Sequence, residues 1–412
     1  MEPLSDAAGP RRGFIAWIGK RLPVRELIES QLTGYYAPKN LNAWYFFGVI
    51  ALVVLVSQFA TGIVLAMFYK PGEATAFDSV EYIMREVPWG WLIRYVHTTG
   101  ASAFFVVIYL HMFRSLLYGS YKRPRELLWI LGMLVYFALM AEAFMGYVLP
   151  WGNMSFWGAQ VIVNLFGTLP GIGPGLVEWI RGDYAISEAA LGRFFSLHVV
   201  AVPLVLALLV ALHLVALRSV GSNNPDGVEI KDQLDANGRP VDGIPFHPYH
   251  IVKDLLSVAI FLALFATVVF FVPTFGGLFL EADNFNPANP TSTPEHIAPV
   301  WYFTPFYAIL RAVPDQRLGA LLMLLAVAAF VFLPWLDRSP VRSIRYKGGL
   351  SRIFLAMFAI SFIALGYLGL QPAEGMYVLF ARVFTCCYFA YFCLMPFYTR
   401  TESSSDPLMH RS

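Results

Sequence analysis

The sequence predicts an all-α integral membrane protein with eight transmembrane helices. Of its 412 residues, 58% are hydrophobic and only 14% are charged, and the mean hydropathy is +0.59. Soluble domains carry roughly 25% charged residues, so this composition excludes a water-soluble enzyme and a disordered chain. The 29 basic and 27 acidic residues nearly cancel. No polybasic surface therefore points to a nucleic-acid partner.

Each transmembrane helix needs about 20 mostly apolar residues. Eight segments of the sequence meet this requirement: 44–69, 92–113, 127–149, 194–217, 255–273, 318–334, 353–370 and 376–397. The polar residues 1–43 contain four prolines and no signal-peptide core, so we expect the first span to be retained as a membrane anchor. Residues 14–32 are predicted to form an amphipathic helix on the membrane surface.

Basic residues indicate the orientation of the spans. The N-terminus, the loops after spans 2, 4 and 6, and the C-terminus hold 21 of the 29 Lys and Arg residues. The positive-inside rule therefore places both termini in the cytoplasm, in a multi-pass protein of the cell membrane. We expect five regions: a cytoplasmic segment 1–43, a bundle of spans 1–4 at 44–220, a cytoplasmic loop 221–254, a helical region 255–398, and a cytoplasmic tail 399–412.

Two loops on the opposite side are long, 150–193 and 274–317, and are rich in Gly, Pro and aromatic residues. Such loops are typical of lids or docking platforms rather than linkers. The three cysteines, Cys386, Cys387 and Cys393, all lie in the last span and form no CxxC or CxxCH pattern. The sequence therefore shows no disulfide framework, iron–sulfur site or covalent haem attachment.

Four histidines lie inside spans, where ionisable residues usually mark a functional site. His97 and His111 in span 2 are 14 residues apart, which places them on one helix face and about 21 Å apart. His198 and His213 in span 4 are 15 residues apart, an overshoot of about 60°. A kink or local unwinding at Pro203 would restore their alignment.

Spans 2 and 4 run in the same direction, so His97 and His198 share one depth and His111 and His213 share the other. Each pair could bind a flat metal macrocycle from both sides, as in bis-histidine haem. We therefore predict two non-covalently bound haems in the bundle of spans 1–4. The alternative is a set of buried histidines hydrogen-bonded to the backbone.

Glycines repeat the spacing of the histidines. Gly48 and Gly62 in span 1, and Gly132 and Gly146 in span 3, are also 14 residues apart. Chain direction places Gly62 and Gly146 at the depth of His97 and His198, and the other two glycines at the depth of the second histidine pair. Because glycine allows close approach to a backbone, we interpret them as slots for porphyrin edges; ordinary helix packing is the alternative.

Arginines bracket both histidine levels. Arg94 and Arg193 lie outside the first pair, and Arg114 and Arg218 lie outside the second. Their guanidinium groups could bind haem propionates through bidentate hydrogen bonds. Snorkelling to the membrane surface is the alternative for each.

Four sequence strings resemble cytochrome b of the respiratory ubiquinol–cytochrome c oxidoreductase: GYVLPWGNMSFWGAQVI (146–162), GSNNPDG (221–227), IPFHPY (244–249) and WYFTPFYAILRAVP (301–314). The resemblance, to a bacterial member, runs from about Tyr36 to Tyr398. It implies two b haems, of low potential at His97 and His198 and of high potential at His111 and His213. It also implies a Q-cycle, in which ubiquinol is oxidised and ubiquinone is reduced within the lipid membrane. The implied partners are a Rieske iron–sulfur protein and a membrane-anchored c-type cytochrome, in a homodimeric complex.

The resemblance implies a quinol-oxidation site built from two segments. Its residues are Tyr147, Met154, Gly158 and Ile162 after span 3, and Pro299, Val300, Trp301, Tyr302 and Tyr307 in the second long loop. The common family motif here is Pro-Glu-Trp-Tyr, whose Glu bonds quinol and carries a proton away. Val300 replaces that Glu, and valine can do neither. Glu142 or Glu295 is our candidate for the missing proton acceptor; a neutral buried acid and a solvated loop residue are the respective alternatives.

The resemblance places a quinone-reduction site at Ser222, Asn223, Lys253 and Asp254. Arg218 occupies the position where relatives often carry a quinone-bonding histidine, and arginine cannot give up its proton. We therefore assign Arg218 a positioning or propionate role and proton delivery to Asp254 and Lys253. His247 and His250 in the same loop are interpreted as structural or proton-conducting residues.

Two other functions remain open at this stage. A di-haem anchor that relays electrons between a dehydrogenase and the quinone pool would have one quinone site. A transporter would bind no haem, and its paired histidines would relay protons.

Overall fold

The computed structural model describes residues 17–18, 21–22, 29–183 and 185–402. In these residues, eight helical segments are long and apolar enough to cross a membrane, which confirms the predicted all-α membrane fold. The helices that form them are α3 (Phe47–Ala66), α5 (Gly90–Tyr118), α6 (Glu126–Val148), α10 (Val202–Val220), α11 (Ile251–Phe271), α13 (Gln316–Ala328), α15 (Gly349–Gly369) and α16 (Gly375–Tyr398). Most of the predicted surface helix 14–32 and of the tail 399–412 lies outside the described residues.

Shorter elements extend the spans or connect them. The α-helices among them are α4 (Ala76–Arg85), α7 (Asn153–Phe166), α8 (Gly173–Arg181), α9 (Glu188–Ser196), α12 (Thr304–Arg311) and α14 (Leu333–Leu336). The 3-10 helices are η2 (Ala43–Tyr45), η4 (Ile230–Asp232), η6 (Phe275–Gly277), η7 (Ala282–Phe285), η8 (Trp301–Phe303) and η9 (Ala329–Phe332), and the π-helices are η1 (Glu29–Thr33), η3 (Leu197–Ala201) and η5 (Phe246–His250). Strands β1 (Tyr36–Pro38) and β2 (Gly243–Pro245) pair antiparallel, with Tyr36 opposite Pro245.

The fourth span contains the irregularity that the histidine spacing predicted. The π-helix η3 lies between α9 and α10 and ends at Ala201, two residues before Pro203. The N–H of Val202 bonds to the carbonyl of Leu197, five residues earlier. Proline cannot donate the next backbone hydrogen bond. A π-turn accommodates one extra residue, so the 15-residue interval between His198 and His213 covers nearly the rotation of 14 α-helical residues.

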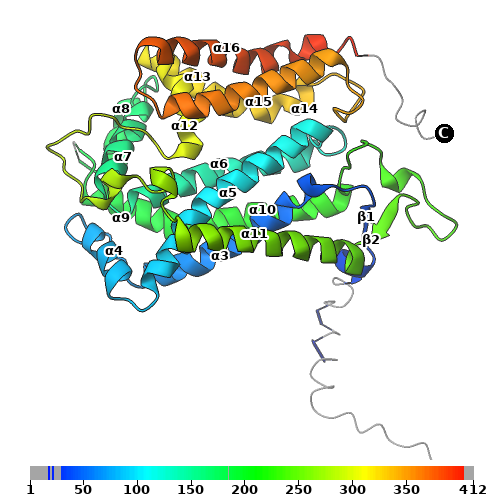
Figure 1. Cartoon of the computed structure of the whole chain (residues 1–412), viewed down its shortest axis with the longest axis horizontal. Helices are drawn as coiled ribbons and strands as arrows, with labels where there is room; N and C mark the ends of the chain where they lie inside the picture. Colours follow the sequence, from blue (N-terminus) through cyan, green and yellow to red (C-terminus); the bar gives the residue numbers. More distant parts are fainter. Residues whose placement is uncertain (1–16, 19–20, 23–28, 184, 403–412) are drawn as a thin grey trace, which may run out of the picture.

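The spans form two groups that run along the long axis of the molecule (Figure 1). One group contains α3, α5, α6, α10 and α11, in which α3 packs on α5 and α6 packs on α10. The other contains α13, α15 and α16. Helix α12 contacts all three helices of this second group and lies between the groups. Helices α4, α7 and α8 lie at one end of the molecule and the β1–β2 pair lies at the other.

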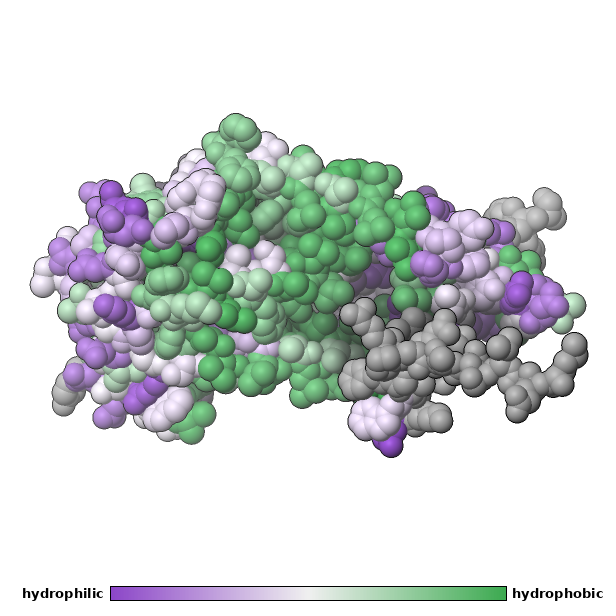
Figure 2. Space-filling model, turned by 90° about the horizontal axis from the view of Figure 1, so that it is seen from below, coloured by the Kyte–Doolittle hydropathy of each residue, from purple (hydrophilic) through white to green (hydrophobic). Residues whose placement is uncertain are grey.

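Apolar side chains form a band around the middle of the molecule, and polar side chains gather at both ends (Figure 2). The most hydrophobic windows of the fourth and fifth spans are each only 6% buried. Leu204, Leu208 and Val215 of α10, for example, point outward. Exposed apolar surface of this extent is stable only against lipid or a partner, so the chain has the surface of a multi-pass membrane protein.

Buried ion pairs join the loops at the β1–β2 end. The Asp337 carboxylate lies 2.9 Å from Lys122 Nζ and 2.6 Å from Lys347 Nζ, and it accepts a hydrogen bond from Tyr121 at 2.6 Å. Burial alone would raise the pKa of Asp337, but the two ammonium groups outweigh it and hold that pKa below its usual range. In the same region, the Nη1 and Nη2 atoms of Arg125 donate hydrogen bonds to the two carboxylate oxygens of Glu229. These contacts fix the loops after spans 2, 4 and 6 against one another.

Candidate functional site

The first helix group contains two pairs of histidines, and in each pair the two imidazole rings lie close together. The ring centroids of His97 and His198 are 6.2 Å apart, with the ring planes 88° to each other. Those of His111 and His213 are 6.5 Å apart, at 61°. When two imidazole nitrogens each lie about 2 Å from one metal ion, the ring centroids are about 6 Å apart. Both pairs therefore have the separation of two axial ligands on one iron.

Hydrogen bonds at Nδ1 orient the rings of the first pair. Nδ1 of His97 lies 2.9 Å from Thr61 Oγ1, whose own proton goes to the carbonyl of Ser57. Nδ1 of His198 lies 3.0 Å from the carbonyl of Glu142 and 3.0 Å from its Oε1. Both rings thus use Nδ1–H as a donor, which leaves Nε2 as the nitrogen for a metal.

Each of the four glycines lies against one histidine ring. A Cβ atom at Gly48 would lie 3.3 Å from Cε1 of His111, one at Gly62 would lie 3.2 Å from Cε1 of His97, and one at Gly132 would lie 3.2 Å from Cε1 of His213. Gly146 faces His198 even more closely. The glycines therefore share the depths of the histidines, and they do so by admitting the imidazole rings of the neighbouring helix.

The two imidazole ligands at each level suit a haem iron better than a bare metal ion. Among the described residues, no group of three or more His, Cys, Asp or Glu side chains is placed to hold a metal ion. A haem iron needs only two protein ligands, because the macrocycle supplies the other four. Paired imidazoles and adjacent glycines satisfy that requirement at both levels.

The arginines at the two levels differ in their contacts. Arg94 is buried at 8% exposure. Arg114 donates to Ser120 at 3.1 Å, approaches Nδ1 of His111 at 3.4 Å and keeps a buried Nε atom without a hydrogen-bond partner. Arg193 instead donates to the carbonyl of Trp179 in α8 and lies over its ring. Arg94 is therefore a buried cation and Arg114 a half-buried one, whereas Arg193 is held against α8.

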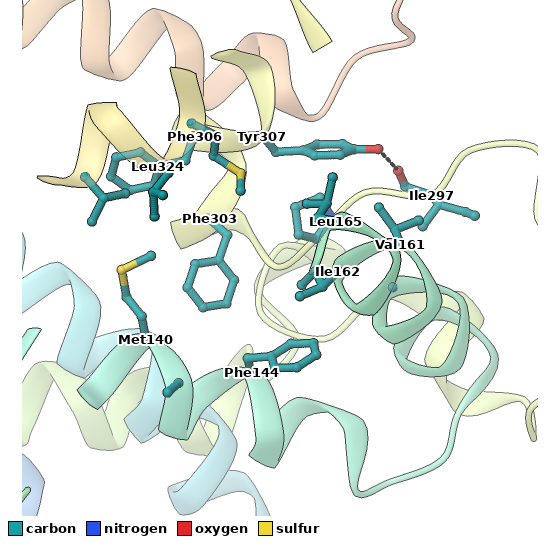
Figure 3. Close-up of a pocket in the computed structure, with 15 residues that line it drawn as sticks. Met140, Phe144, Val161, Ile162, Leu165, Ile297, Phe303, Phe306, Tyr307 and Leu324 are labelled. Carbon is teal, nitrogen blue, oxygen red and sulfur yellow. Dashed lines mark hydrogen bonds between the residues drawn. The ribbon is translucent and has the colours of Figure 1, made fainter. Parts of the chain in front are cut away.

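A cavity of about 290 Å³ opens between α6, α7, α12 and α13 (Figure 3). Of the residues predicted for quinol oxidation, Gly158, Ile162, Pro299 and Tyr307 line it. Phe144 and Met140 of α6 face it from the helix that carries Glu142 and Gly146. Its walls are almost wholly apolar, and its size suits a hydrophobic ring with a tail. The cavity lies on the His97–His198 side of the bundle.

The remaining predicted residues of this site are packed in the protein interior. Met154 and Val300 are buried. The buried Tyr302 ring stacks on Phe105 with centroids 3.9 Å apart, and Trp301 donates to Ser102 at 3.1 Å. Tyr302 is not among the residues that line the cavity.

Neither acidic candidate from the sequence faces the cavity. Glu295 is exposed in the loop, and Glu142 bonds His198. The structure instead brings Glu281 to the site: Tyr147 donates a hydrogen bond to Glu281 Oε2 at 3.2 Å. The Tyr147 ring also lies 3.7 Å from the Cβ position of Gly158, a cavity residue. Burial raises the pKa of Glu281 to about 7, although the hydrogen bond from Tyr147 lowers it.

Sequence reasoning missed Glu281 because it lies 134 residues from Tyr147 in the chain. The one available signal was an acidic residue directly after the apolar run 268–280 of the second long loop.

A second polar cluster lies near the β1–β2 end, beyond His213. The Arg218 guanidinium lies between the rings of Tyr35 and Phe246, at 4.1 and 4.6 Å, and its Nη1 atom is buried without a hydrogen-bond partner. His250 Nε2 lies 3.7 Å from Asp254 Oδ1, and the His250 ring lies 5.3 Å from that of Phe246. The structure thus brings Arg218, His250 and Asp254 together around one aromatic ring.

The other residues that the sequence predicted in this region lie in different environments. Ser222 lies 3.4 Å from the Tyr35 hydroxyl and so belongs to the cluster. Asn223 is buried and donates to the carbonyl of Tyr118, but its Oδ1 atom has no hydrogen-bond partner. Lys253 and His247 are exposed.

Comparisons with known proteins agree with this geometry. A family model described as cytochrome b/b6/petB matches residues 32–221, and one described as cytochrome b(C-terminal)/b6/petD matches residues 287–389. The chain is 58% identical to cytochrome b of Allochromatium vinosum over 95% of this chain and 96% of the relative. It is 44% identical to cytochrome b of Rhodobacter capsulatus over 95% of this chain and 93% of the relative.

A solved structure is also similar. A chain of a hyperthermophilic respiratory Complex III superposes with a TM-score of 0.87 at 39% sequence identity, covering 94% of this chain and 99% of that one. Family membership implies that the chain binds haem. Both family models, the curated relatives and the shared fold show that the chain belongs to the cytochrome b family of the respiratory ubiquinol–cytochrome c oxidoreductases.

Proposed function

We propose that this chain oxidises quinol at one membrane face, passes electrons across the bilayer through two b haems, and reduces quinone at the other face. The observation that carries this proposal is the order of sites along the bundle. The apolar cavity, the pair His97–His198, the pair His111–His213 and the cluster of Arg218, His250 and Asp254 follow one another from end to end.

The chain's own residues would hold both haems. His97 and His198 would bind one iron through Nε2, and His111 and His213 would bind the other. Arg94, which is buried, and Arg114, which is half-buried, would be the cations for the propionates. When bound, the haems supply one-electron transfer between the two faces.

Proton release at the cavity is assigned to Glu281. A quinol hydroxyl bound in the cavity donates to Tyr147 Oη, which in turn donates to Glu281 Oε2. A carboxyl group with a pKa of about 7 is poised to accept a proton near neutral pH. Glu281 thereby takes the role that Val300 cannot fill.

Proton uptake at the opposite end is assigned to Asp254 and His250. Quinone reduction consumes two protons, and these are the titratable side chains that face each other beside Arg218. The guanidinium of Arg218, held between two rings, positions the quinone with its free Nη1 donor.

The two reduction-site candidates from the sequence can be separated by substitution. We expect Asp254→Asn to slow quinone reduction at least about tenfold, because the amide cannot deliver a proton. Lys253→Gln should leave the rate within about twofold, since Lys253 is exposed. The rate at which quinone reoxidises the quinol-reduced haem, recorded with and without an inhibitor of the quinone-reduction site, measures this step. Equal losses in both variants would contradict the assignment of Asp254.

The partners and orientation complete the proposal. The electron that does not enter the haems goes to a Rieske iron–sulfur protein and then to a membrane-anchored c-type cytochrome, in a homodimeric complex. The cavity end faces the positive side, and both termini face the cytoplasm.

Potentiometric titration of the haem absorption bands in the membrane-bound complex tests the proposed function. We expect two b-type components of different midpoint potential, and separate inhibitors that block quinol oxidation and quinone reduction. A single inhibitor-sensitive quinone site would instead make the chain a passive electron relay. Absence of haem would overturn the proposal.

A further inference from the structure

We propose that Glu142 sets the redox potential of the haem bound by His97 and His198, through its hydrogen bond to His198. This inference rests on the proposed bis-histidine haem at that level. It assigns Glu142 a tuning role in place of proton exchange with quinol.

The hydrogen bond itself is well defined. His198 Nδ1 lies 3.0 Å from Glu142 Oε1 and 3.0 Å from the carbonyl oxygen of the same residue. Nδ1–H is therefore shared between two acceptors on α6. The Nε2 atom, on the opposite side of the ring, is the nitrogen left to bind iron.

A carboxyl group at this position has a cost that a structural role does not explain. Glu142 lies in a membrane span with a side chain only 16% exposed, and its Oε2 atom is buried without a hydrogen-bond partner. Burying such a group is unfavourable. The backbone carbonyl already satisfies Nδ1–H and fixes the ring. The side chain thus adds negative character to the ligand rather than orientation.

The two haem levels carry opposite groups beside their ligands. A carboxyl oxygen contacts Nδ1 of His198, and a neutral hydroxyl, Thr61 Oγ1, contacts Nδ1 of His97 on the same iron. At the other level, the guanidinium of Arg114 lies 3.4 Å from Nδ1 of His111. Acceptors on the remote nitrogen of an axial histidine increase its basicity, whereas a nearby cation decreases it.

This asymmetry predicts which of the two haems has the lower redox potential. A more basic ligand and a nearby negative group stabilise ferric iron, which carries one more positive charge than ferrous iron. Glu142 therefore lowers the potential at the His97–His198 level, and Arg114 raises it at the His111–His213 level. An electron entering near the cavity then moves to a site of higher potential.

The test is a redox titration of the assembled membrane complex carrying Glu142→Gln. The amide keeps the size of the side chain and an oxygen acceptor but removes the carboxyl group. We expect the ratio of ferrous to ferric haem at a fixed ambient potential to rise about tenfold for one haem, which equals about 59 mV for one electron. The other haem should not shift, because its ligands have no contact with Glu142. Glu142→Leu should shift the same haem at least as far.

Glu178→Gln is the matched control, since it makes the same chemical change on exposed α8. It should leave both potentials unchanged. Unchanged potentials in Glu142→Gln and Glu142→Leu, with both haems bound, would overturn the inference. Loss of the haem in both variants would also overturn it, because Glu142 would then be a structural anchor. A wild-type complex without haem at His97 and His198 would refute the proposed function itself.

Discussion

Replacement of His213 by leucine is expected to remove one haem from the complex and to abolish electron transfer between the two quinone sites. Leucine has no lone pair for iron, and His213 faces His111 at the separation of two axial ligands. A bis-histidine site that loses one ligand loses most of its affinity for the macrocycle. The haem at His97 and His198 lies at a separate level and should remain bound.

The measurement is the pyridine haemochrome content together with the reduced-minus-oxidised spectrum of the purified complex. We expect half the wild-type content of haem b and loss of one potentiometric component. His247→Leu is the control, because His247 is an exposed histidine outside both pairs. If both haems remained in His213→Leu with unaltered absorbance, the assignment of the ligands would be wrong.

Replacement of Glu281 by glutamine is expected to slow quinol oxidation by a factor of about 10² to 10⁴, the usual contribution of a general base. Only the ionised carboxylate can accept the proton that Tyr147 passes on. With a pKa of about 7, its ionised fraction increases between pH 6 and pH 8. The wild-type rate should therefore rise with pH, with an inflection near pH 7, and this inflection should disappear in Glu281→Gln.

Presteady-state reduction of haem by quinol, recorded from pH 5.5 to 9 with the quinone-reduction site inhibited, measures this effect. Glu295→Gln serves as the control and should retain both the rate and the inflection, because Glu295 is exposed and Tyr147 donates its hydrogen bond to Glu281 instead. A pH profile of Glu281→Gln that matches the wild type would exclude Glu281 as the acceptor.

The fold was largely predictable because membrane spans obey a local rule. Lipid offers no hydrogen bonds, so each span needs about 20 apolar residues in sequence, and a window of that length finds it. The details at helix ends were less predictable. The π-helix at Leu197–Ala201 was expected only as an unspecified kink near Pro203. The buried ion pair between Lys122 and Asp337 joins two loops that are far apart in the chain, and it left no local pattern in the sequence.

The residues of the candidate site were likewise predictable where they lie in one helix and unpredictable where they lie in different loops. Spacing within one helix relates His97 to His111 and Gly48 to Gly62, because an α-helix has a fixed rotation and rise per residue. Contacts between loops have no such period. The exposed Glu295 and Glu281, which bonds Tyr147, lie only 14 residues apart in one loop, and nothing in their spacing distinguishes them.

By itself, the sequence determined eight spans, two levels of paired histidines and the loss of a carboxylate at Val300. Only the tertiary structure decided which acid stands beside Tyr147, which acid bonds His198, and that Arg193 is held by α8. The physical reason is the distance along the chain over which each interaction acts. Hydrophobicity and helical periodicity act between neighbours in the chain, whereas a hydrogen bond forms between any two groups that packing brings within about 3 Å.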